Sequence, residues 1–336
     1  MTDAAAEPST GRAAGGSTAV RAVFFGSGSF AVPILDALAG MQGVRLEAVV
    51  SAPDRPVGRK AIVTPTPVTA RARELGLPVL QPVRVRLPES VEAVRLLVPD
   101  LIVLADYGQI IPRVMLDLPA RGFLNLHPSA LPRHRGAAPI PATILAGDTE
   151  SAVTLIVVTE EMDAGPIVAV APLDVRSDDT AVTLEARAAD VAAALLRRAL
   201  PEWLAGRLEA RPQPTDGVTM TRPLRREDGR LDPARSAVEL ERQVRAYEPW
   251  PGAYIVSDKT RGGRLIIKKA RVVPSQPGDA NLIGGLGPPS VAFVAPSEPP
   301  YFPTSNGRLV LEVMQAAGGR AMDAADFVRG HPDIVR

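Results

Sequence analysis

The sequence predicts an α/β protein with a doubly wound, mostly parallel, Rossmann-like sheet, followed by a smaller β-barrel domain of the OB-like type. Three observations support this prediction. Apolar runs of strand length alternate with helical segments up to about Trp203, the pattern changes near Leu224, and 336 residues that are 46% hydrophobic suffice for two cores.

Several runs rich in Val, Leu and Ile have the length and composition of buried strands. They are Val20–Phe25, Leu46–Val50, Leu101–Ala105, Phe123–Leu126, Val153–Val158 and Ile167–Ala171. The helix-like segments are Ala31–Ala39, Pro67–Leu75, Glu89–Leu97, Pro139–Ala146 and an Ala-rich helix that begins near Thr180 and reaches about Trp203. This alternation predicts the first domain.

The composition then shifts toward a small β domain. A helical stretch at Ser236–Ala246 precedes strand-like runs at Tyr254–Val256, Leu265–Ala270 and Leu309–Met314. The Gly/Pro-rich segment Pro274–Pro303 lacks periodicity and is expected to be a long loop. We therefore divide the chain into a disordered tail (1–18), a first domain (19–205), a linker (206–222) and a second domain (223–336).

Charge and composition exclude some classes of protein. The net charge is +1, so the overall charge does not indicate a polyanionic partner, and any RNA contact must depend on local patches. The chain has no cysteine, which fits a reducing compartment and removes disulfides, thiolate metal sites and cysteine nucleophiles. No segment has the apolar length of a signal sequence or membrane span, so we expect a cytoplasmic protein without a membrane partner.

Polar residues follow two of the predicted strands. Asn125 and His127 end an apolar strand at positions i and i+2, so their side chains should share one face at the carboxyl edge, where open α/β sheets bind ligands. Asp163 lies beyond the next strand, in the segment Glu160–Gly165, and could reach the same edge. The alternative is a strand-terminal Asn with a structurally bonded His, and a turn at Asp163.

A glycine-containing turn and a cationic loop leave further alternatives open. Residues Gly26–Ala31 fit a dinucleotide fingerprint, but Val50 and Ser51 stand where its acidic residue belongs, so the glycines could merely allow a tight turn. The loop 52–60 carries Arg55, Arg59 and Lys60, which suit phosphates or a solvated surface. The three histidines are scattered, so no metal site is expected.

Two ordered motifs resemble those of the folate-dependent formyltransferases. The first is an Asn-x-His followed by a Ser-Leu-Leu-Pro-like turn, and it comprises Asn125, His127, Ser129, Leu131, Pro132, Arg133, Arg135, Gly136 and Pro139. The second is a Val-Thr strand followed by Asp-x-Gly, here Val153-Thr154 and Asp163-Ala164-Gly165. Pro53–Arg59 resembles the loop of methionyl-tRNA formyltransferases, and Ala246–Ala253 resembles the start of their C-terminal barrel.

The resemblance implies an enzyme that transfers the formyl group of 10-formyltetrahydrofolate to methionyl initiator tRNA. It implies that Asn125, His127 and Asp163 are catalytic, with amide and imidazole donors on the formyl oxygen and the carboxylate orienting His127 and carrying the proton. It places the tetrahydrofolate derivative along Ser129, Ala130, Leu131 and Pro132. It assigns tRNA to Arg55, Arg59 and Lys60 and to the C-terminal domain, in a protein expected to be a monomer without a metal.

The chain departs from the family pattern at several positions. They are Lys60, Asp106, Ala130, His134 and Thr159. Three rival functions remain: formylation of an amino sugar nucleotide by the same three residues, an NAD-dependent dehydrogenase built on the turn at Gly26 and Gly28, and a non-enzymatic RNA-binding module. The acceptor that gains formyl, the binding of NAD, and RNA binding without transfer distinguish them.

Overall fold

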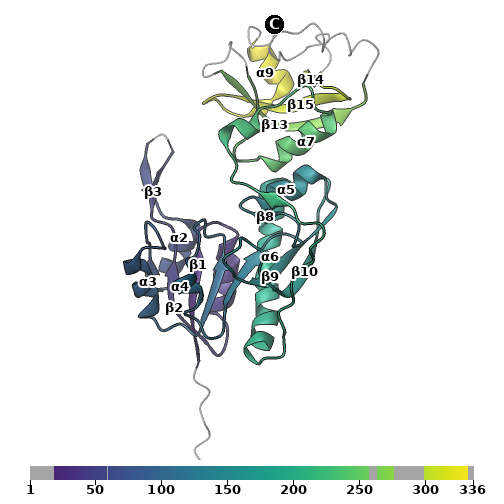
Figure 1. The fold of residues 1–336 in the computed structure, drawn as a ribbon. Helices are drawn as coiled ribbons and strands as arrows, with labels where there is room; N and C mark the ends of the chain where they lie inside the picture. The colour runs from purple at the N-terminus through teal and green to yellow at the C-terminus, as the bar shows by residue number, and fades with distance from the viewer. Residues whose placement is uncertain (1–18, 59, 257–262, 276–298, 332–336) are drawn as a thin grey trace, which may run out of the picture.

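A computed structural model describes residues 19–58, 60–256, 263–275 and 299–331 (Figure 1). The expected tail at 1–18 lies outside these residues. The first domain is built on a seven-stranded sheet. From one edge to the other its strands are β5 (Val79–Leu80), β2 (Val44–Val50), β1 (Val20–Gly26), β6 (Leu101–Ala105), β7 (Phe123–His127), β9 (Glu150–Val157) and β10 (Ile167–Asp174).

The strands from β5 to β7 are parallel, whereas β9 pairs antiparallel with both of its neighbours, β7 and the edge strand β10. Alternate residues of each strand face opposite cores, since successive side chains point to opposite faces. In β1, Ala22 and Phe24 belong to one core, and Val23 and Phe25 to the other. The predicted doubly wound, mostly parallel sheet is confirmed.

Helices cover both faces of this sheet (Figure 1). The larger core includes residues of α1 (Ala31–Ala39), α2 (Pro67–Glu74), α5 (Pro139–Ala146) and α6 (Ala181–Leu204). The opposite core includes residues of α3 (Pro88–Arg95) and α4 (Arg113–Leu116). The α6 helix begins at a capping box, in which the Thr180 side chain accepts a hydrogen bond from the Thr183 N–H.

A hairpin projects from the first domain where the sequence predicted only a loop. It consists of β3 (Arg55–Val57) and β4 (Ile62–Thr64), which pair antiparallel. Its base is fixed by Asp54, whose Oδ1 lies 2.6 Å from Gln81 Nε2 and whose Oδ2 lies 3.3 Å from Arg73 Nη2. The Gln81 amide, with help from Arg73, lowers the pKa of the Asp54 carboxyl.

The described part of the second domain contains an antiparallel sheet and the helices α7 and α9. Its elements are α7 (Ala237–Ala246), β12 (Ala253–Val256), β13 (Arg264–Val273), β14 (Tyr301–Pro303), β15 (Arg308–Ala316), β16 (Met322–Asp323) and α9 (Ala324–Gly330). Their apolar side chains form a separate core that includes Leu240 and Phe327. The described strands pair in an open path, so the predicted barrel is a curled half-barrel.

The prediction of a long loop at Pro274–Pro303 is wrong at its C-terminal end. Residues 276–298 lie outside the described chain, but Tyr301–Pro303 form β14, which pairs with β15. Tyr301 and Phe302 are fully buried, and Pro303 ends the strand, where its missing N–H is tolerated. The Pro-rich composition hid this short strand.

The two domains contact each other through α5 and α7. The Arg245 Nη1 atom in α7 donates a hydrogen bond of 2.8 Å to the main-chain oxygen of Asp179, and Tyr247 packs into the core of the first domain. The linker also returns to the first domain, because β11 (Met220–Thr221) pairs with β8 (Arg135–Gly136). None of the described helices has the length and apolarity to cross a membrane.

Candidate active site

The end of β7 carries two buried polar side chains. Leu124 and Leu126 of this strand face the core that contains α6, so Asn125 and His127 point to the opposite face. Asn125 is 7% exposed and His127 is 5% exposed. Burial of two polar side chains at a strand end requires hydrogen-bond partners, and these come from the loops that follow β7 and β9.

Asp163 lies in the loop between β9 and β10 and reaches both residues. Its Oδ1 accepts a hydrogen bond of 3.3 Å from Asn125 Nδ2, and its Oδ2 lies 3.6 Å from His127 Nδ1. The Gly136 N–H also donates to Oδ2, at 2.8 Å. The structure thus brings the three sequence-predicted residues together around one carboxylate.

The two nitrogens of His127 have different surroundings. Nε2 lies 3.0 Å from the main-chain oxygen of His134. A carbonyl oxygen can only accept, so Nε2 carries a hydrogen in this contact. Nδ1 faces Asp163, so it is the ring nitrogen that lies beside the carboxylate.

Asn125 retains unused hydrogen-bonding capacity. Its amide nitrogen has two N–H groups, of which one is directed to Asp163. Its buried Oδ1 has no hydrogen-bond partner among the described residues. A buried amide that is only partly satisfied is costly, and a ligand group at this position would use the remaining capacity.

The turn that follows His127 is held internally. The Ser129 hydroxyl donates a hydrogen bond of 2.7 Å to Arg133 O, and the Thr154 hydroxyl donates one of 2.7 Å to Ser129 O. Ser129, Leu131 and Pro132 are buried, whereas Ala130 is partly exposed. The turn therefore offers a shaped wall, and the Ser129 side chain supports it from inside.

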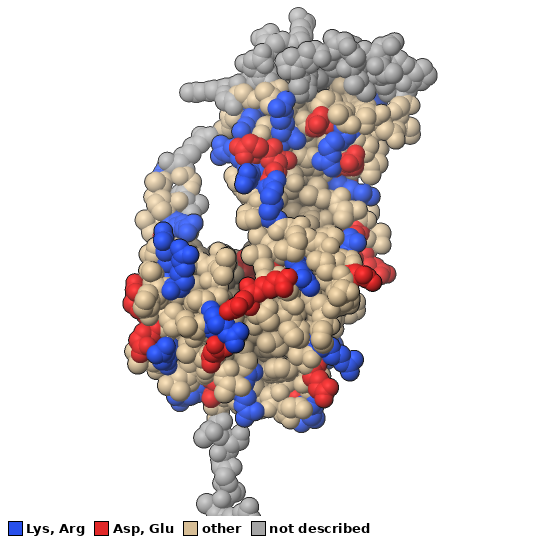
Figure 2. Space-filling model, viewed as in Figure 1, with Lys and Arg blue, Asp and Glu red and all other residues tan. Residues whose placement is uncertain are grey.

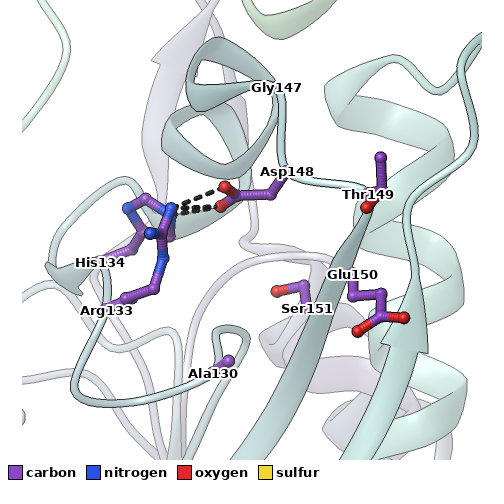
Figure 3. A pocket seen from close by; sticks show the side chains of 8 residues that line it. All are labelled: Ala130, Arg133, His134, Gly147, Asp148, Thr149, Glu150 and Ser151. Carbon is purple, nitrogen blue, oxygen red and sulfur yellow. Dashed lines mark hydrogen bonds and ion pairs between the residues drawn. The ribbon is translucent and has the colours of Figure 1, made fainter. Parts of the chain in front are cut away.

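A pocket of about 370 Å³ adjoins this turn (Figure 3). It is lined by Ala130, Arg133, His134, Gly147, Asp148, Thr149, Glu150 and Ser151. Arg133 and His134 both point to Asp148, with Arg133 Nη2 2.6 Å from Oδ1 and His134 Nε2 2.9 Å from Oδ2 (Figure 3). Asn125, His127 and Asp163 do not line this pocket, so it lies beside their site.

The cationic residues of the predicted loop lie on the hairpin. Arg55 in β3 and Lys60 before β4 are exposed, and neither has a carboxylate partner within the described part of the chain. Arg59 lies outside the described residues. The hairpin stands apart from the C-terminal domain, and the space-filling view shows an opening between them (Figure 2). The exposed cations of the hairpin are accessible to an anion.

The glycine-containing turn after β1 is occupied by a carboxylate. A Cβ at Gly28 would collide with the carboxylate of Asp106, which lies directly over this turn. Desolvation against the turn raises the pKa of Asp106, the nearby charge of Glu185 raises it further, and the Gly28 N–H opposes the shift. A carboxylate at the place of a pyrophosphate disfavours the dinucleotide interpretation.

One residue of the site was missed by sequence reasoning. Gln213 in the linker donates hydrogen bonds from Nε2 to Asp163 O and Gly165 O, at 2.7 and 2.8 Å. It stands between two prolines in a segment without periodicity, so no pattern indicated that it reaches the site. For metals, the described residues contain no cluster of three or more His, Asp or Glu that could hold an ion.

Comparison with known proteins agrees with this geometry. Residues 20–200 match the formyl transferase family, and residues 223–332 match the formyl transferase C-terminal domain. A methionyl-tRNA formyltransferase of Myxococcus xanthus is 40% identical, covering 93% of this chain and 95% of its own length. Another, of Halorhodospira halophila, is 42% identical, covering 93% of this chain and 96% of its own length.

A solved structure shares the fold. HypX from Aquifex aeolicus, in complex with tetrahydrofolic acid, is 18% identical with a TM-score of 0.61 over 94% of this chain, which spans 48% of HypX. The matches to both formyl transferase domains, together with relatives at about 40% identity over nearly the whole chain, decide against the dehydrogenase and the non-enzymatic alternatives. The chain belongs to the methionyl-tRNA formyltransferases of the formyl transferase family.

Proposed function

We propose that this enzyme transfers the formyl group of 10-formyltetrahydrofolate to the α-amino group of methionyl initiator tRNA, and that Asn125, His127 and Asp163 carry the reaction. The observation that supports these roles is the contact of Asp163 with both other side chains at the end of β7. The family supports the substrates, since relatives at 40 to 42% identity are named methionyl-tRNA formyltransferases.

Each of the three side chains has a separate task in this proposal. Bound 10-formyltetrahydrofolate supplies the carbonyl carbon that the acceptor amine attacks, with negative charge developing on the formyl oxygen. The second N–H of Asn125 donates to this oxygen, together with His127 Nδ1–H when the ring is protonated. A single donor of this kind contributes roughly 100- to 1,000-fold to turnover.

Asp163 takes part in proton transfer in this reaction. Its Oδ2 lies beside His127 Nδ1, so it stabilises the protonated ring and accepts the proton that the attacking amine loses. That proton is passed on to N10 of the folate, directly or through water, as the bond between the formyl carbon and N10 breaks and tetrahydrofolate leaves. The Gly136 N–H keeps Oδ2 of Asp163 in place. Because the amine attacks directly, the mechanism needs no covalent bond between the enzyme and the formyl group.

The exposed side chains around the site indicate where the folate and the tRNA bind in this proposal. We place the folate against the turn at Ser129–Pro132, where Ala130 offers the accessible surface. The folate also contacts Asn125, whose unpartnered amide oxygen fits a group that donates hydrogen bonds. Arg55, Arg59 and Lys60 on the hairpin, and the C-terminal domain, contact the phosphates of the tRNA acceptor end. We further propose a cytoplasmic monomer that requires no metal.

The test offers the enzyme a choice of acceptors. Purified protein is given 10-formyltetrahydrofolate with methionyl initiator tRNA, with an amino sugar nucleotide, or with methionyl elongator tRNA, and the formylated product is identified by mass. We expect formyl-methionine on the initiator tRNA and little product from the other two acceptors. Formyl transfer to the sugar nucleotide instead would overturn the proposed acceptor while leaving the roles of the three side chains open.

A further inference from the structure

The linker between the two domains reaches into the candidate site through one amide side chain. Gln213 Nε2 donates to the main-chain oxygens of Asp163 and Gly165, at 2.7 and 2.8 Å. Its Oε1 accepts from Arg135 Nε and Nη2, at 3.0 and 2.8 Å. Both amide N–H groups and the amide oxygen are therefore used, in a segment where a solvated side chain would be expected.

The segment that Gln213 holds is constrained and carries the carboxylate. Asp163 has a φ of 50°, a left-handed conformation that a residue with a Cβ adopts only at a cost in free energy. Beyond it, a Cβ at Gly165 would collide with the carbonyl oxygen of Val157, so the chain passes against β9 without room to shift. Gln213 ties the carbonyl groups on both sides of Ala164.

The linker runs alongside the same loop for a short distance. Arg211 and Ile167 exchange two main-chain hydrogen bonds, of 2.7 and 2.8 Å. On the other side of the site, Thr219 Oγ1 accepts a hydrogen bond of 2.7 Å from the N–H of His134, whose carbonyl oxygen contacts His127. The linker thus contacts the main chain of Asp163 and of the residue that holds His127.

We propose that Gln213 is a positioning residue for formyl transfer, which sets the main chain of Asp163 and thereby the distance from its carboxylate to His127 and Asn125. This inference rests on the proposed function of Asp163. The simpler alternative is that Gln213 only anchors the linker to Arg135 and so supports the fold.

Two substitutions separate these roles. Gln213→Glu keeps an acceptor for Arg135 but replaces both donated hydrogen bonds by a carboxylate oxygen facing two carbonyl oxygens. Gln213→Ala removes the donors and the acceptor together. If Gln213 acts through Asp163, both variants lose about 10- to 100-fold in kcat, as a misplacement near 1 Å does, with a smaller change in KM for tRNA. If it only anchors the linker, the Glu variant stays near wild-type kcat.

The decisive measurement is a double-mutant cycle on single-turnover formylation of methionyl initiator tRNA. Gln213→Ala is compared in the wild-type and the Asp163→Asn background, with Thr215→Ala, an exposed neighbour in the linker, as the control. We expect the loss caused by Gln213→Ala to shrink to less than threefold in the Asp163→Asn background, because the group it positions is gone. Equal losses in both backgrounds would overturn the inference.

A second readout covers folding and the proposed function itself. We expect Gln213→Ala to shift the pH profile of kcat, while Thr215→Ala leaves it unchanged, and circular dichroism at the assay temperature verifies that each variant is folded. An unchanged profile, or a kcat loss explained by the unfolded fraction alone, would contradict the positioning role. Full activity of Asp163→Asn would instead refute the proposed function, which keeps the two failures distinguishable.

Discussion

The Nδ1 atom of His127 lies 3.6 Å from Oδ2 of Asp163, while the opposite nitrogen of the same ring lies 3.0 Å from the main-chain oxygen of His134. Because a carbonyl oxygen can only accept, Nε2 carries a hydrogen in this contact, and Nδ1 is the nitrogen that faces the carboxylate. His134 itself has a φ of 58°, and Asp148 and Thr219 hold it in that conformation. Residues outside the proposed catalytic group therefore fix the orientation of the His127 ring.

The Thr154 hydroxyl holds the turn at Ser129–Pro132, against which we place the folate. It is fully buried, donates to Ser129 O at 2.7 Å and accepts from Leu131 N at 3.4 Å. In Thr154→Val the Ser129 oxygen loses its side-chain donor and keeps only the Leu131 N–H at 3.1 Å, so we expect the free energy of unfolding to fall by about 0.5 to 1.5 kcal/mol and KM for 10-formyltetrahydrofolate to rise more than KM for tRNA. Denaturant unfolding and steady-state kinetics measure both, with the exposed Thr215→Val as the control. Parallel rises in the two KM values would contradict the assignment of this wall to the folate.

The carboxylate of Asp106 makes stability depend on pH. Desolvation over Gly28 and the charge of Glu185 raise its pKa above the usual value of 3.8. The folded state thus holds the proton more tightly, so this group destabilises the protein increasingly as pH rises from 3.8 through the raised pKa. Asp106→Asn, which also tolerates the left-handed φ of 48°, should raise Tm at a pH of about 7.5, with a smaller gain at about 4.5. A gain of equal size at both pH values would count against this explanation.

The cations of the hairpin should act on tRNA through charge. Arg55→Ala and Lys60→Ala each remove an exposed cation without a carboxylate partner in the described chain. We expect KM for methionyl initiator tRNA to rise and KM for the folate to stay constant. The slope of the log binding constant against log salt should become shallower by about 1 for each cation that no longer pairs with a phosphate. Arg197→Ala, an exposed cation on α6, is the charge-matched control. A similar weakening in Arg197→Ala would show that the effect reports net charge only.

Much of the first domain could be read from periodicity alone. The predicted helices at Ala31–Ala39 and Pro139–Ala146 have the bounds of α1 and α5, and the predicted strand Leu101–Ala105 is β6. These segments are apolar and are followed by Gly40, Gly147 and Asp106, so local preference and tertiary burial agree. The parallel arrangement up to β7 then places Asn125 and His127 at the carboxyl edge.

Other features depended on tertiary interactions that no local pattern reveals. The apolar sequences of β9 and β10 resemble those of the parallel strands. The segment 158–166 between them is too short for a helical crossover, however, and the pair is antiparallel. The Pro and Gly content of the β3–β4 hairpin predicted a loop and not two strands. The sequence around Asp163 is typical of a turn, and Asp163 does lie in a turn, with a φ of 50°, so its place in the site gave no separate signal. Gln213 gave no signal, since its role comes from meeting a loop far away in the chain.

The proposed mechanism requires the carboxylate of Asp163 for the chemical step. Asp163→Asn keeps the size of the side chain and an acceptor for the Gly136 N–H, but removes the charge beside His127 Nδ1. The most direct test is the single-turnover rate of formyl transfer to methionyl initiator tRNA at saturating 10-formyltetrahydrofolate, with Glu160→Gln as an exposed carboxylate control in the same loop. We predict a loss of at least about 100-fold for Asp163→Asn, a wild-type rate for Glu160→Gln, and similar Tm values for both. A folded Asp163→Asn variant that transfers formyl at the wild-type rate would contradict a catalytic role of this carboxylate.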